Sequence, residues 1–543
     1  MRAINALLVC MMTVVAVEAQ PPYLADPAPG QVFLTPRIDL DLGPVPLVVP
    51  ERYATANLAE RELMLPPGFS VNVFAAGEPL EGPRFMAWDP EGVLHVANMK
   101  AGGGSEFAPP VNTARPPAVE QMKGQVLALP DRDGDGVADE ILVVADQFWF
   151  PNSIQFFAGY LYVADMHQVV RLRDSDGDGR YEEREIVVPD LPIGHHRTRT
   201  IEFDRQREKL YLSIGSSCDL CRESDPRRAT IMEFDPDGSS GRVYASGLRN
   251  AVGLGMHPVS NELWITTNGH DREGAHLPPE MVTVVRDGGF YGWPLAFGFR
   301  SWIDFSISAY QDLIFPLTAQ DSSDVERVPR PVAMLQAHTA PMDVHFYQGE
   351  RFPEQYSNAA LVAFRGASKS RDVGGYKVVA LFADSDGQNA RVGDFLTGFQ
   401  SGRDVWGEPT GLATDAQGNL FVSSDWRNHM ILRVVASPHV TAVADEGGVQ
   451  PDGFLLAQNY PNPFNAETVI HYNIGRKGAV ALSVFNLAGQ QVRRLVREVR
   501  TPGFYQIAWD GRDDRGQEMA SGVYIYRLQV GDLAEARKLL LLR

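Results

Sequence analysis

The sequence predicts an all-β chain, in which a six-bladed β-propeller is followed by a small Ig-like β-sandwich. Patterns with the 3.6-residue period of a helix are scarce along the 543 residues, whereas short β-favouring runs bounded by turns recur. One such run occurs six times, and the composition changes near residue 437. With 44% hydrophobic and 22% charged residues, the chain can bury a large core, so we expect folded domains rather than disorder.

The repeated run follows a turn that contains Gly or Asp and begins with Leu and an aromatic or apolar residue. Its six copies, each interpreted as the second strand of a blade, begin at Leu94, Leu161, Leu210, Leu263, Leu361 and Leu420. Repeats about 50 to 100 residues apart, each supplying several short strands, are typical of a β-propeller. We therefore expect six blades within residues 55–436.

Residues 1–19 have the features of a signal peptide, with the basic Arg2, an apolar run that ends at Val17, and the small residue Ala19. The mature chain would begin at Gln20, with an N-terminal extension over residues 20–54. The apolar run is shorter than the roughly 20 residues of a membrane-spanning helix. We therefore expect an exported protein with no membrane span in the mature chain.

The cysteines predict one disulfide. Cys10 would leave with the signal peptide, so Cys218 and Cys221 remain as a close pair. In an oxidising environment such a pair is expected to form a small-loop disulfide. Metal or redox chemistry is the alternative, although zinc needs two more ligands nearby and covalent haem needs His where Arg222 stands.

The charge balance restricts the partners. The formal net charge is −19, which argues against nucleic-acid binding through phosphate neutralisation and favours bound cations. Residues 453–543 differ from the rest, because 12 Lys and Arg outnumber 8 Asp and Glu there. This asymmetry indicates two separate parts, joined by a linker at residues 437–452.

The C-terminal part has four strand signals, at residues 467–472, 479–485, 503–509 and 522–528, which predict a small β-sandwich. Its motifs NYPNPFN (459–465), FNLAG (485–489), WDGRD (509–513) and ASGVY (520–524) resemble the Ig-like C-terminal sorting domain of the type IX secretion system. The resemblance implies export through the periplasm of a Gram-negative bacterium by the type IX machinery, and a secreted or cell-surface location. An ordinary Ig-like adhesion or spacer module is the alternative.

Two acidic loops predict calcium sites. One has acids at positions 1, 3, 5, 9 and 12 of an EF-hand-type loop with Gly179 at position 6, namely Asp174, Asp176, Asp178, Glu182 and Glu185. The second repeats the first half with Asp131, Asp133 and Asp135. Leu142 occupies its position 12, so Asp139 or Glu140 would have to complete the set. Solvated acidic turns are the alternative in both loops.

A propeller brings the inner ends of its blades to one axis, so polar residues just before each second strand can converge. The candidates are Arg84, Asn152, His195, His196, Arg249, Asn250, His338 and Lys369. A neutral His is a suitable general base near pH 7, and Arg with Asn can hold carboxylate or quinone oxygens. Structural polar residues are the alternative interpretation.

A set of motifs in the larger part resembles the sorbosone dehydrogenase group, which belongs with the soluble glucose and pyranose dehydrogenases that use pyrroloquinoline quinone (PQQ). The motifs are LPPGF (65–69), PRFMA (83–87), GHHRTRT (194–200), GSSCDLC (215–221), DPRRAT (225–230), GLRN (247–250), GFYGWP (289–294) and GYKVV (375–379). The resemblance runs from about residue 65 to residue 435. It implies an exported dehydrogenase that oxidises an aldose or related sugar with PQQ and calcium and passes the electrons to an external acceptor.

The resemblance also implies roles for individual residues. His196 matches the base that takes the proton of the sugar hydroxyl, with His195 as an orienting partner. Arg249 and Asn250 match a pair that contacts the cofactor, with Arg84, Asn152 and Lys369 as further candidates. The backbone carbonyls of Gly269 and His270 match those that hold calcium, which polarises the quinone.

Two departures from the family pattern favour alternatives. The sequence RGASKS at residues 365–370 replaces a stretch that contains Trp and Arg, and Lys369 or Arg371 would have to supply the charge. Glu408 stands where Arg is common, and its carboxylate would repel a tricarboxylate cofactor. The chain could therefore be a sugar- or polymer-binding propeller that has lost PQQ. A calcium-dependent lactonase, with Glu408 as an axial carboxylate, is a further alternative.

Overall fold

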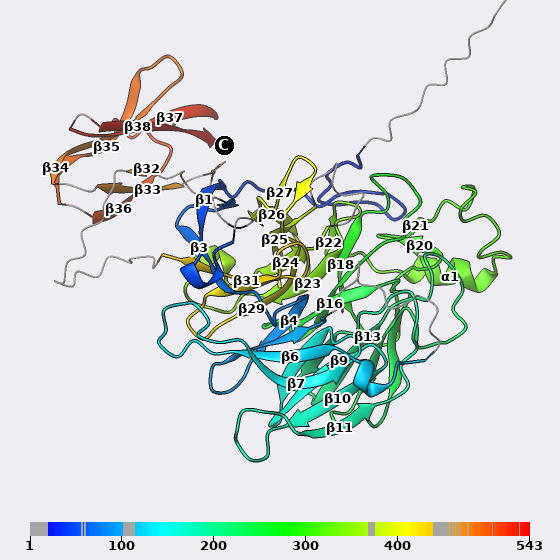
Figure 1. Cartoon of the computed structure of the whole chain (residues 1–543). Helices are drawn as coiled ribbons and strands as arrows, with labels where there is room; N and C mark the ends of the chain where they lie inside the picture. The colour runs from blue at the N-terminus through cyan, green and yellow to red at the C-terminus, as the bar shows by residue number, and fades with distance from the viewer. Residues whose placement is uncertain are drawn as a thin grey trace, which may run out of the picture. The chain divides into compact units, whose positions relative to one another are not determined.

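The computed structural model describes residues 20–55, 58, 61–100, 115–366, 375–437 and most of 455–542 (Figure 1). The chain divides into two compact units, Met1–Ser437 and Pro438–Arg543. Within the described residues, α1 (Ala319–Arg327) is the single α-helix, and the all-β prediction is confirmed. No helix of this part is long and apolar enough to cross a membrane. The predicted signal peptide, Lys369, Arg371 and all of the linker beyond Ser437 lie outside the described residues.

Unit 1 contains six sheets of four or more strands. The first three are β4 (Pro83–Trp88), β5 (Leu94–Asn98), β6 (Gly124–Leu129) and β7 (Leu142–Phe148); β8 (Ser153–Phe157), β9 (Tyr160–Asp165), β10 (Gln168–Arg173) and β11 (Glu183–Val188); and β12 (Ile201–Asp204), β13 (Lys209–Ile214), β14 (Thr230–Phe234) and β15 (Arg242–Ser246) with β19 (Gly289–Phe290). The next two are β16 (Ala251–Met256), β17 (Leu263–Thr267), β18 (Glu280–Val285) and β22 (Ala333–Leu335); and β23 (Pro341–Phe346), β24 (Ala360–Phe364), β25 (Lys377–Phe382) and β26 (Arg391–Leu396).

The sixth sheet joins the two ends of unit 1. It contains β29 (Pro409–Thr414), β30 (Leu420–Ser424), β31 (Met430–Ala436), β3 (Phe69–Ala76), β1 (Gly43–Val48) and β2 (Glu62–Leu65). Strand β3 runs antiparallel to β31, with Phe69 opposite Ala436. Strand β1, which falls in the predicted extension, pairs in parallel with β3.

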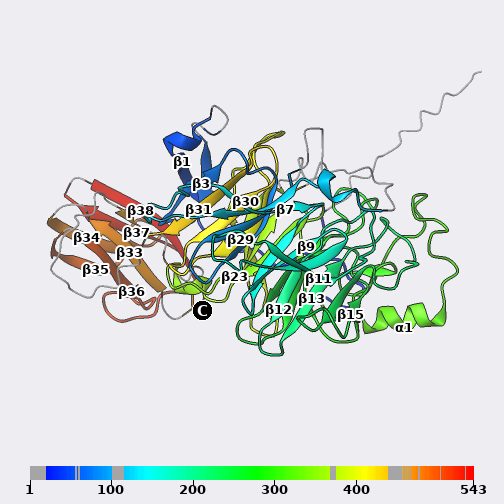
Figure 2. The same ribbon diagram turned by 60° about the horizontal axis from the view of Figure 1, so that its bottom comes forward.

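The first strands of the six sheets contact one another in a cycle, in the order β4, β8, β12, β16, β23, β29 and back to β4. The second and third sheets lie side by side in this cycle (Figures 1 and 2). The six repeated runs form the second strand of each sheet, as predicted: β5, β9, β13, β17, β24 and β30. Each of these strands begins at the expected Leu or one residue before it.

Apolar side chains fill the spaces between neighbouring sheets. Tyr162 and Leu212 belong to one buried cluster that spans the second and third sheets, and Trp264 with Val362 belongs to another that spans the fourth and fifth. Burying one large apolar side chain contributes about 1.5 to 3 kcal/mol. The packed sheets therefore form a stable frame for the polar loops at the ends of their strands.

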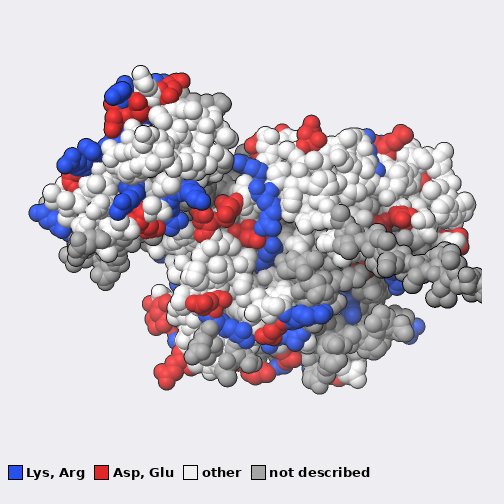
Figure 3. Space-filling model, turned by 90° about the horizontal axis from the view of Figure 1, so that it is seen from above, with Lys and Arg blue, Asp and Glu red and all other residues white. Residues whose placement is uncertain are grey.

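Short elements complete unit 1. They are η1 (Glu51–Tyr53), η2 (Val119–Gln121), η3 (Glu354–Tyr356), the pair β20 (Ala296–Phe297) and β21 (Ser301–Trp302), and the pair β27 (Gln400–Ser401) and β28 (Asp404–Val405). On the face of the molecule in Figure 3, the described Lys and Arg side chains are interspersed with Asp and Glu side chains.

Unit 2 contains two sheets around one buried cluster. One sheet has β32 (Leu455–Leu456), β33 (Thr468–Ile474) and β36 (Gly503–Trp509); the other has β35 (Gln491–Arg500), β34 (Gly478–Phe485), β37 (Gly522–Val530) and β38 (Leu533–Leu541). The buried cluster includes Tyr472 from the first sheet and Leu482 and Tyr526 from the second. The four predicted strands are present, and β32, β35 and β38 are additional.

Candidate functional site

The segment at residues 194–200 holds His196 next to the end of β13. His196 Nδ1 lies 2.9 Å from both the backbone oxygen and the Oγ of Ser216. Ser216 Oγ donates its own proton to the backbone oxygen of Cys218, at 2.6 Å, so it can only accept from the imidazole. Both contacts therefore place the proton of a neutral His196 on Nδ1 and leave Nε2 as an acceptor.

The charge state of His196 follows from its surroundings. Burial lowers the pKa of His196 well below its usual value, and the positive charge of Arg249 and the neighbouring His195 lower it further. Burial and Arg249 also lower the pKa of His195, the more exposed of the two rings. The ring centroids of the two histidines are 4.6 Å apart in an edge-to-face arrangement. His196 is thus a neutral imidazole at pH 7.

Buried arginines fix the backbone of this segment. Arg199 is fully buried and donates to the carbonyls of Pro192, His196 and Thr198 at 2.6 to 3.0 Å. Burial lowers the pKa of Arg199 to about 9. Irregular backbone near a protein core needs donors for its carbonyls, and the guanidinium supplies several from one plane. Arg199 of the GHHRTRT motif is therefore structural support for the histidines.

Glycine is required at position 215, between β13 and Ser216. A Cβ atom there would lie 2.5 Å from Asn250 Oδ1 and 2.5 Å from His196 Cβ, distances that side chains do not adopt. The two predicted residues His196 and Asn250 therefore both lie against one glycine.

Arg249 is held by two carboxylates. Its Nη2 donates to Asp219 Oδ1 at 2.8 Å and to Asp271 Oδ2 at 3.0 Å, and its Nε donates to the backbone oxygen of Asp219 at 3.0 Å. Arg249 Nη1 contacts the backbone oxygen of Asn268 at 3.3 Å. Arg249 and other polar neighbours hold the pKa of Asp219 below its usual value. The pairing with Asp219 was not predicted from the sequence.

Several acceptor oxygens beside Arg249 have no partner among the described residues. Asn250 Oδ1 and Asn268 Oδ1 are buried and unsatisfied. No described residue donates a hydrogen bond to the backbone oxygens of Gly269 and His270. Buried polar atoms normally have partners, so unsatisfied oxygens at one place fit a ligand that brings hydroxyl donors or a hard cation.

Glu280 lies behind these oxygens and accepts from the backbone N–H of Gly269 at 2.7 Å. Burial raises the pKa of Glu280 to about 7. His270, one of the predicted calcium-binding residues, is buried, and its ring contacts Glu273 Oε2 at 2.7 Å. His338 is also buried, and its Nε2 lies 2.7 Å from the backbone oxygen of Gly274.

A second polar cluster includes Arg84 and Asn152, which were predicted to bind the cofactor. Arg84 Nε and Nη2 donate to Asn152 Oδ1 at 2.9 and 2.8 Å, and Arg84 Nη1 pairs with Asp425. Asn152 Nδ2 donates to the backbone oxygen of Arg199 at 3.2 Å and to Thr200 Oγ1 at 3.1 Å, which connects this cluster to the histidine segment.

Glu408 belongs to the same cluster and is neutralised there. Arg365 Nη2 lies 2.9 Å from Glu408 Oε2, and Arg365 Nε lies 3.0 Å from both carboxylate oxygens of Asp425. Asp425 is fully buried, and despite its burial the charges of Arg365 and Arg84 lower its pKa. Two cations and two anions therefore share the cluster, so the repulsion of an anionic cofactor expected from Glu408 alone is offset.

The two acidic loops connect the third and fourth strands of their sheets and share one hydrogen-bond pattern. The carboxylates of Asp174, Asp176 and Glu182 approach within 4.8 Å of one another, as do those of Asp131, Asp133 and Asp135. Glu182 Oε1 accepts from the backbone N–H of Ser175 at 2.9 Å, and Asp139 Oδ2 accepts from that of Arg132 at 2.7 Å.

One predicted loop ligand lies elsewhere, and a second lies in its loop but outside the group of three carboxylates. Glu185, expected at position 12, is in β11 and pairs with Arg171 at 2.7 Å. Asp178 Oδ1 accepts from the backbone N–H of Arg180 at 2.8 Å. Each loop therefore offers three carboxylates to a hard cation, and the second loop also offers the carboxylate of Asp139.

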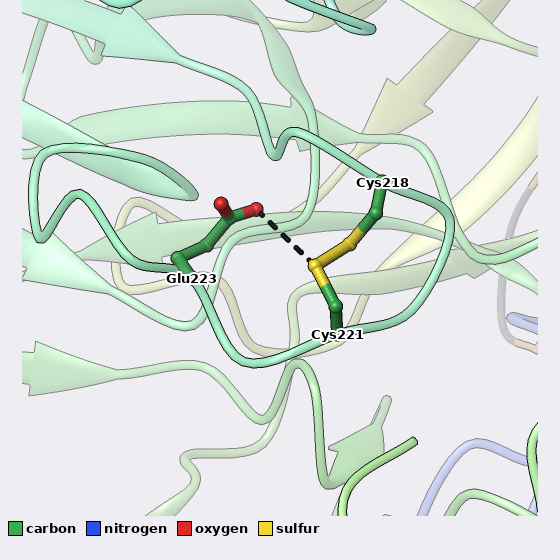
Figure 4. Close-up of side chains that lie close together, drawn as sticks. All are labelled: Cys218, Cys221 and Glu223. Atoms are coloured by element: carbon green, nitrogen blue, oxygen red, sulfur yellow. Dashed lines mark hydrogen bonds between the residues drawn. A yellow bond between two sulfur atoms is a disulfide. The ribbon is translucent and has the colours of Figure 1, made fainter.

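The disulfide between Cys218 and Cys221 is confirmed. Figure 4 shows Glu223 beside it, with Glu223 Oε1 3.9 Å from Cys221 Sγ. Glu223 also accepts from the backbone N–H and the hydroxyl of Ser217, at 2.6 and 2.7 Å. A carboxylate next to a cysteine disfavours its thiolate, so the pair is not arranged as a reactive thiol.

Comparison with known proteins matches a family model to each part of the chain. Residues 55–446 match the model of a family described as a domain of unknown function (DUF7133), and residues 475–532 match the FlgD Ig-like domain. An uncharacterized protein of Borreliella burgdorferi is 25% identical over 380 residues, which cover 67% of this chain and 89% of that one.

Two further relatives are sugar dehydrogenases. The PQQ-dependent pyranose dehydrogenase of Coprinopsis cinerea is 26% identical over 47% of this chain and 42% of its own length. The aldose sugar dehydrogenase YliI of Escherichia coli is 27% identical over 46% of this chain and 62% of its own length. The chain thus spans less than two thirds of either dehydrogenase.

Solved structures share the fold of unit 1. The holo form of the PQQ domain of the Coprinopsis cinerea pyranose dehydrogenase aligns with a TM-score of 0.55 and 20% identity, over 72% of this chain and 99% of that one. The calcium structure of the Trichoderma reesei enzyme of Carbohydrate-Active Enzymes Family AA12 aligns with a TM-score of 0.55 and 21% identity, over 69% and 97%. Unit 1 therefore has the fold of PQQ-dependent sugar dehydrogenases.

Proposed function

We propose that this chain, which belongs to the DUF7133 family through residues 55–446, is an exported quinoprotein dehydrogenase that oxidises an aldose or a related sugar with PQQ and calcium. The observation that carries the proposal is the state of His196, whose Nδ1 is engaged by Ser216 and whose Nε2 is left to accept a proton. The relatedness to PQQ-dependent sugar dehydrogenases supports the reaction class.

The scaffold we propose is a six-bladed β-propeller with a separate Ig-like β-sandwich. Six sheets whose first strands contact one another in a cycle support the propeller. Two sheets around one buried cluster, together with the match to an Ig-like domain, support the sandwich.

In this proposal His196 is the general base. A sugar hydroxyl placed next to Nε2 gives up its proton as hydride leaves the same carbon, and a neutral imidazole is the form that can accept it. Ser216 stabilises the resulting imidazolium, because both of its oxygens accept from Nδ1–H. PQQ, when bound, supplies the two-electron acceptor for the hydride, and calcium polarises its carbonyl.

Two kinds of group fit the cofactor: the charged guanidinium of Arg249, which Asp219 and Asp271 hold in place, and the acceptor oxygens that have no described partner. Arg249 and Asn250 would face its carboxylate and quinone oxygens, and the backbone oxygens of Gly269 and His270 would hold calcium. Asn152 and Arg84 are bound to each other, and Asn152 donates to the backbone of Arg199, so the pair would support the histidine segment. Calcium in the Asp174 and Asp131 loops would be structural, because the loops join paired strands rather than movable helices.

The chain would need partners for export and for turnover. The type IX motifs of unit 2 support passage through the periplasm of a Gram-negative bacterium to a secreted or cell-surface location. The reduced cofactor would pass its electrons to a separate acceptor, because the sequence contains no haem-attachment motif.

A titration of the full chain tests the proposal. Purified protein with calcium is titrated with PQQ while quinone absorbance is followed, and a panel of aldoses is then screened for dye reduction. We expect saturable binding and sugar-dependent reduction, which His196→Gln abolishes without weakening PQQ binding. The absence of PQQ binding at micromolar concentration, in protein that melts cooperatively, would favour the sugar- or polymer-binding alternative. The lactonase alternative loses its candidate ligand, since the carboxylate of Glu408 is bound by Arg365.

A further inference from the structure

The loop closed by the Cys218–Cys221 disulfide lies between the two parts of the candidate site. We propose that this loop is a positioning element, which fixes Arg249 through Asp219 and His196 through Ser216 and thereby keeps the site ready for an anionic ligand. The identity of that ligand rests on the proposed function. The contacts of the loop are independent of the proposed function.

Asp219, one of the two residues inside the loop, is the main partner of Arg249. Its side chain accepts from Arg249 at 2.8 Å, from the backbone N–H of Asp271 at 2.9 Å and from the hydroxyl of Tyr310 at 3.0 Å. Its backbone oxygen accepts from Arg249 Nε at 3.0 Å and from Trp293 Nε1 at 3.2 Å. A shift of this one residue would therefore release Arg249 at two points.

The first residue of the loop acts on the other part of the site. The backbone oxygen of Cys218 accepts from Ser216 Oγ at 2.6 Å. This bond orients the hydroxyl so that it accepts from His196 Nδ1. The same short loop thus orients one of the two acceptors of His196 Nδ1 and the guanidinium of Arg249.

Packing holds the loop from the outside. Leu220 is 3% exposed and belongs to a buried cluster with Trp293 and Tyr310, to which Cys218 and Cys221 also pack. After the loop, Arg222 makes two bonds to Asp321 of α1, at 3.0 and 2.9 Å. Opening the disulfide would therefore free Asp219 locally while the flanking residues stay anchored.

The position of the bond in the chain favours a local role. A disulfide that closes a four-residue loop removes much less chain entropy from the unfolded state than one that closes a long loop. Its contribution to the free energy of unfolding is correspondingly small. A bond of this kind is more effective in restricting the residues that it encloses.

Reduction of the disulfide provides the first test. One molecule of dithiothreitol transfers two electrons and two protons to the bond, which yields the thiols of Cys218 and Cys221 and the cyclic disulfide of the reagent. We expect two additional titratable thiols and little change in melting temperature. We also expect PQQ affinity to weaken about tenfold, as for loss of a residue that orients a ligand-binding group.

A second measurement needs no cofactor. Burial, Arg249 and Arg197 lower the pKa of His195, whereas Asp271 and Asp219 raise it. Asp219→Asn should therefore lower the pKa of the His195 imidazole, followed by NMR against pH. Reduction of the native protein should shift this pKa in the same direction. The matched control is Asp321→Asn, which breaks an ion pair on the same segment away from Arg249 and should leave the His195 pKa unchanged.

The outcomes distinguish a failure of the positioning role of the loop from a failure of the proposed PQQ-dependent function. The variant Cys218→Ser/Cys221→Ser should already show the reduced-state His195 pKa and should not respond to dithiothreitol. If two thiols appear and neither the His195 pKa nor the PQQ affinity changes, the loop has no positioning role. If PQQ binds in no state but the His195 pKa shifts as expected, the loop positions the site and the proposed cofactor is wrong.

Discussion

Arg365 and Glu408 form an ion pair, 2.9 Å between Nη2 and Oε2, across strands that are separated by more than forty residues of sequence. Glu408 is 6% exposed, and Arg365 also binds the fully buried Asp425. The two departures from the family pattern, at residues 365–370 and at Glu408, are therefore connected by an ion pair. Arg365 and Glu408 compensate each other's charge.

Removing one member of this pair should destabilise unit 1. In Glu408→Gln the guanidinium of Arg365 loses one of its two buried carboxylates, and breaking a buried pair costs about 3 kcal/mol. Urea unfolding should show a lower midpoint with an unchanged slope. The control Glu140→Gln breaks the exposed pair of Glu140 with Arg132, which should contribute less than about 1 kcal/mol.

The charge swap Arg365→Glu/Glu408→Arg should not restore stability, because the new carboxylate at position 365 would face Asp425. Recovery of the native unfolding midpoint in the double variant would contradict the role assigned to Asp425.

The buried Asp343 should make stability fall as pH rises from about 4 to about 7. Burial raises the pKa of Asp343 to about 7, above its value in the unfolded chain, so the folded state retains a proton that the unfolded state has lost. Between about pH 4 and pH 7 this lowers the free energy of unfolding by about 1.4 kcal/mol per pH unit. The asparagine variant Asp343→Asn still accepts from the backbone N–H of Leu412 and should give a flatter curve of stability against pH. The exposed Asp404→Asn is the control, and a curve as steep as native in Asp343→Asn would refute the assignment.

Loss of the Ser216 hydroxyl should affect turnover more than cofactor binding. Ser216→Ala keeps the backbone oxygen as one acceptor for His196 Nδ1 and removes the other. We expect a fall of about tenfold in kcat, against about 10² to 10⁴-fold for His196→Gln, which removes the base. Equal losses in the two variants would show that Ser216 does more than orient the imidazole.

Calcium should stabilise the chain through the acidic loops. Adding calcium to chelator-treated protein should raise the melting temperature, because a cation that binds only the folded state adds its binding free energy to stability. Asp174→Asn should remove part of this increase, since Asp174 is one of three carboxylates within 4.8 Å. Glu185→Gln should not, because Glu185 pairs with Arg171 in β11. An equal effect of both variants would return Glu185 to the metal site.

The strand pattern was predictable where both faces of a strand are buried and weakly predictable elsewhere. The six Leu-initiated strands have buried residues throughout, so β-favouring residues occur together in the sequence. Strand β35 contains the run QVRRLVREVR, of which only Val496 is buried, and this pattern resembles a charged surface segment. Pairing with β34 keeps β35 in its sheet despite the Arg residues.

The candidate site was predictable by residue type but not by partner. His196, Arg249 and Asn250 follow from motifs. Ser216 and Asp219 determine the state of two of them, and they lie in the motif GSSCDLC, which assigned no role to either. Glu408 was expected to be a free negative charge because its partner Arg365 comes from another sheet. Such pairings depend on which strands become neighbours, and no local pattern records this.

The pairing of β3 with β31 has a consequence for the order of events during synthesis. Phe69 finds its partner Ala436 only after more than 360 intervening residues have been made, and contacts that distant in sequence form slowly. Until residue 436 has left the ribosome, β31 is missing and β3 and β30 have open edges. Such edges can pair with other chains. Holding the nascent chain unfolded until its last strand is available would therefore protect it from aggregation.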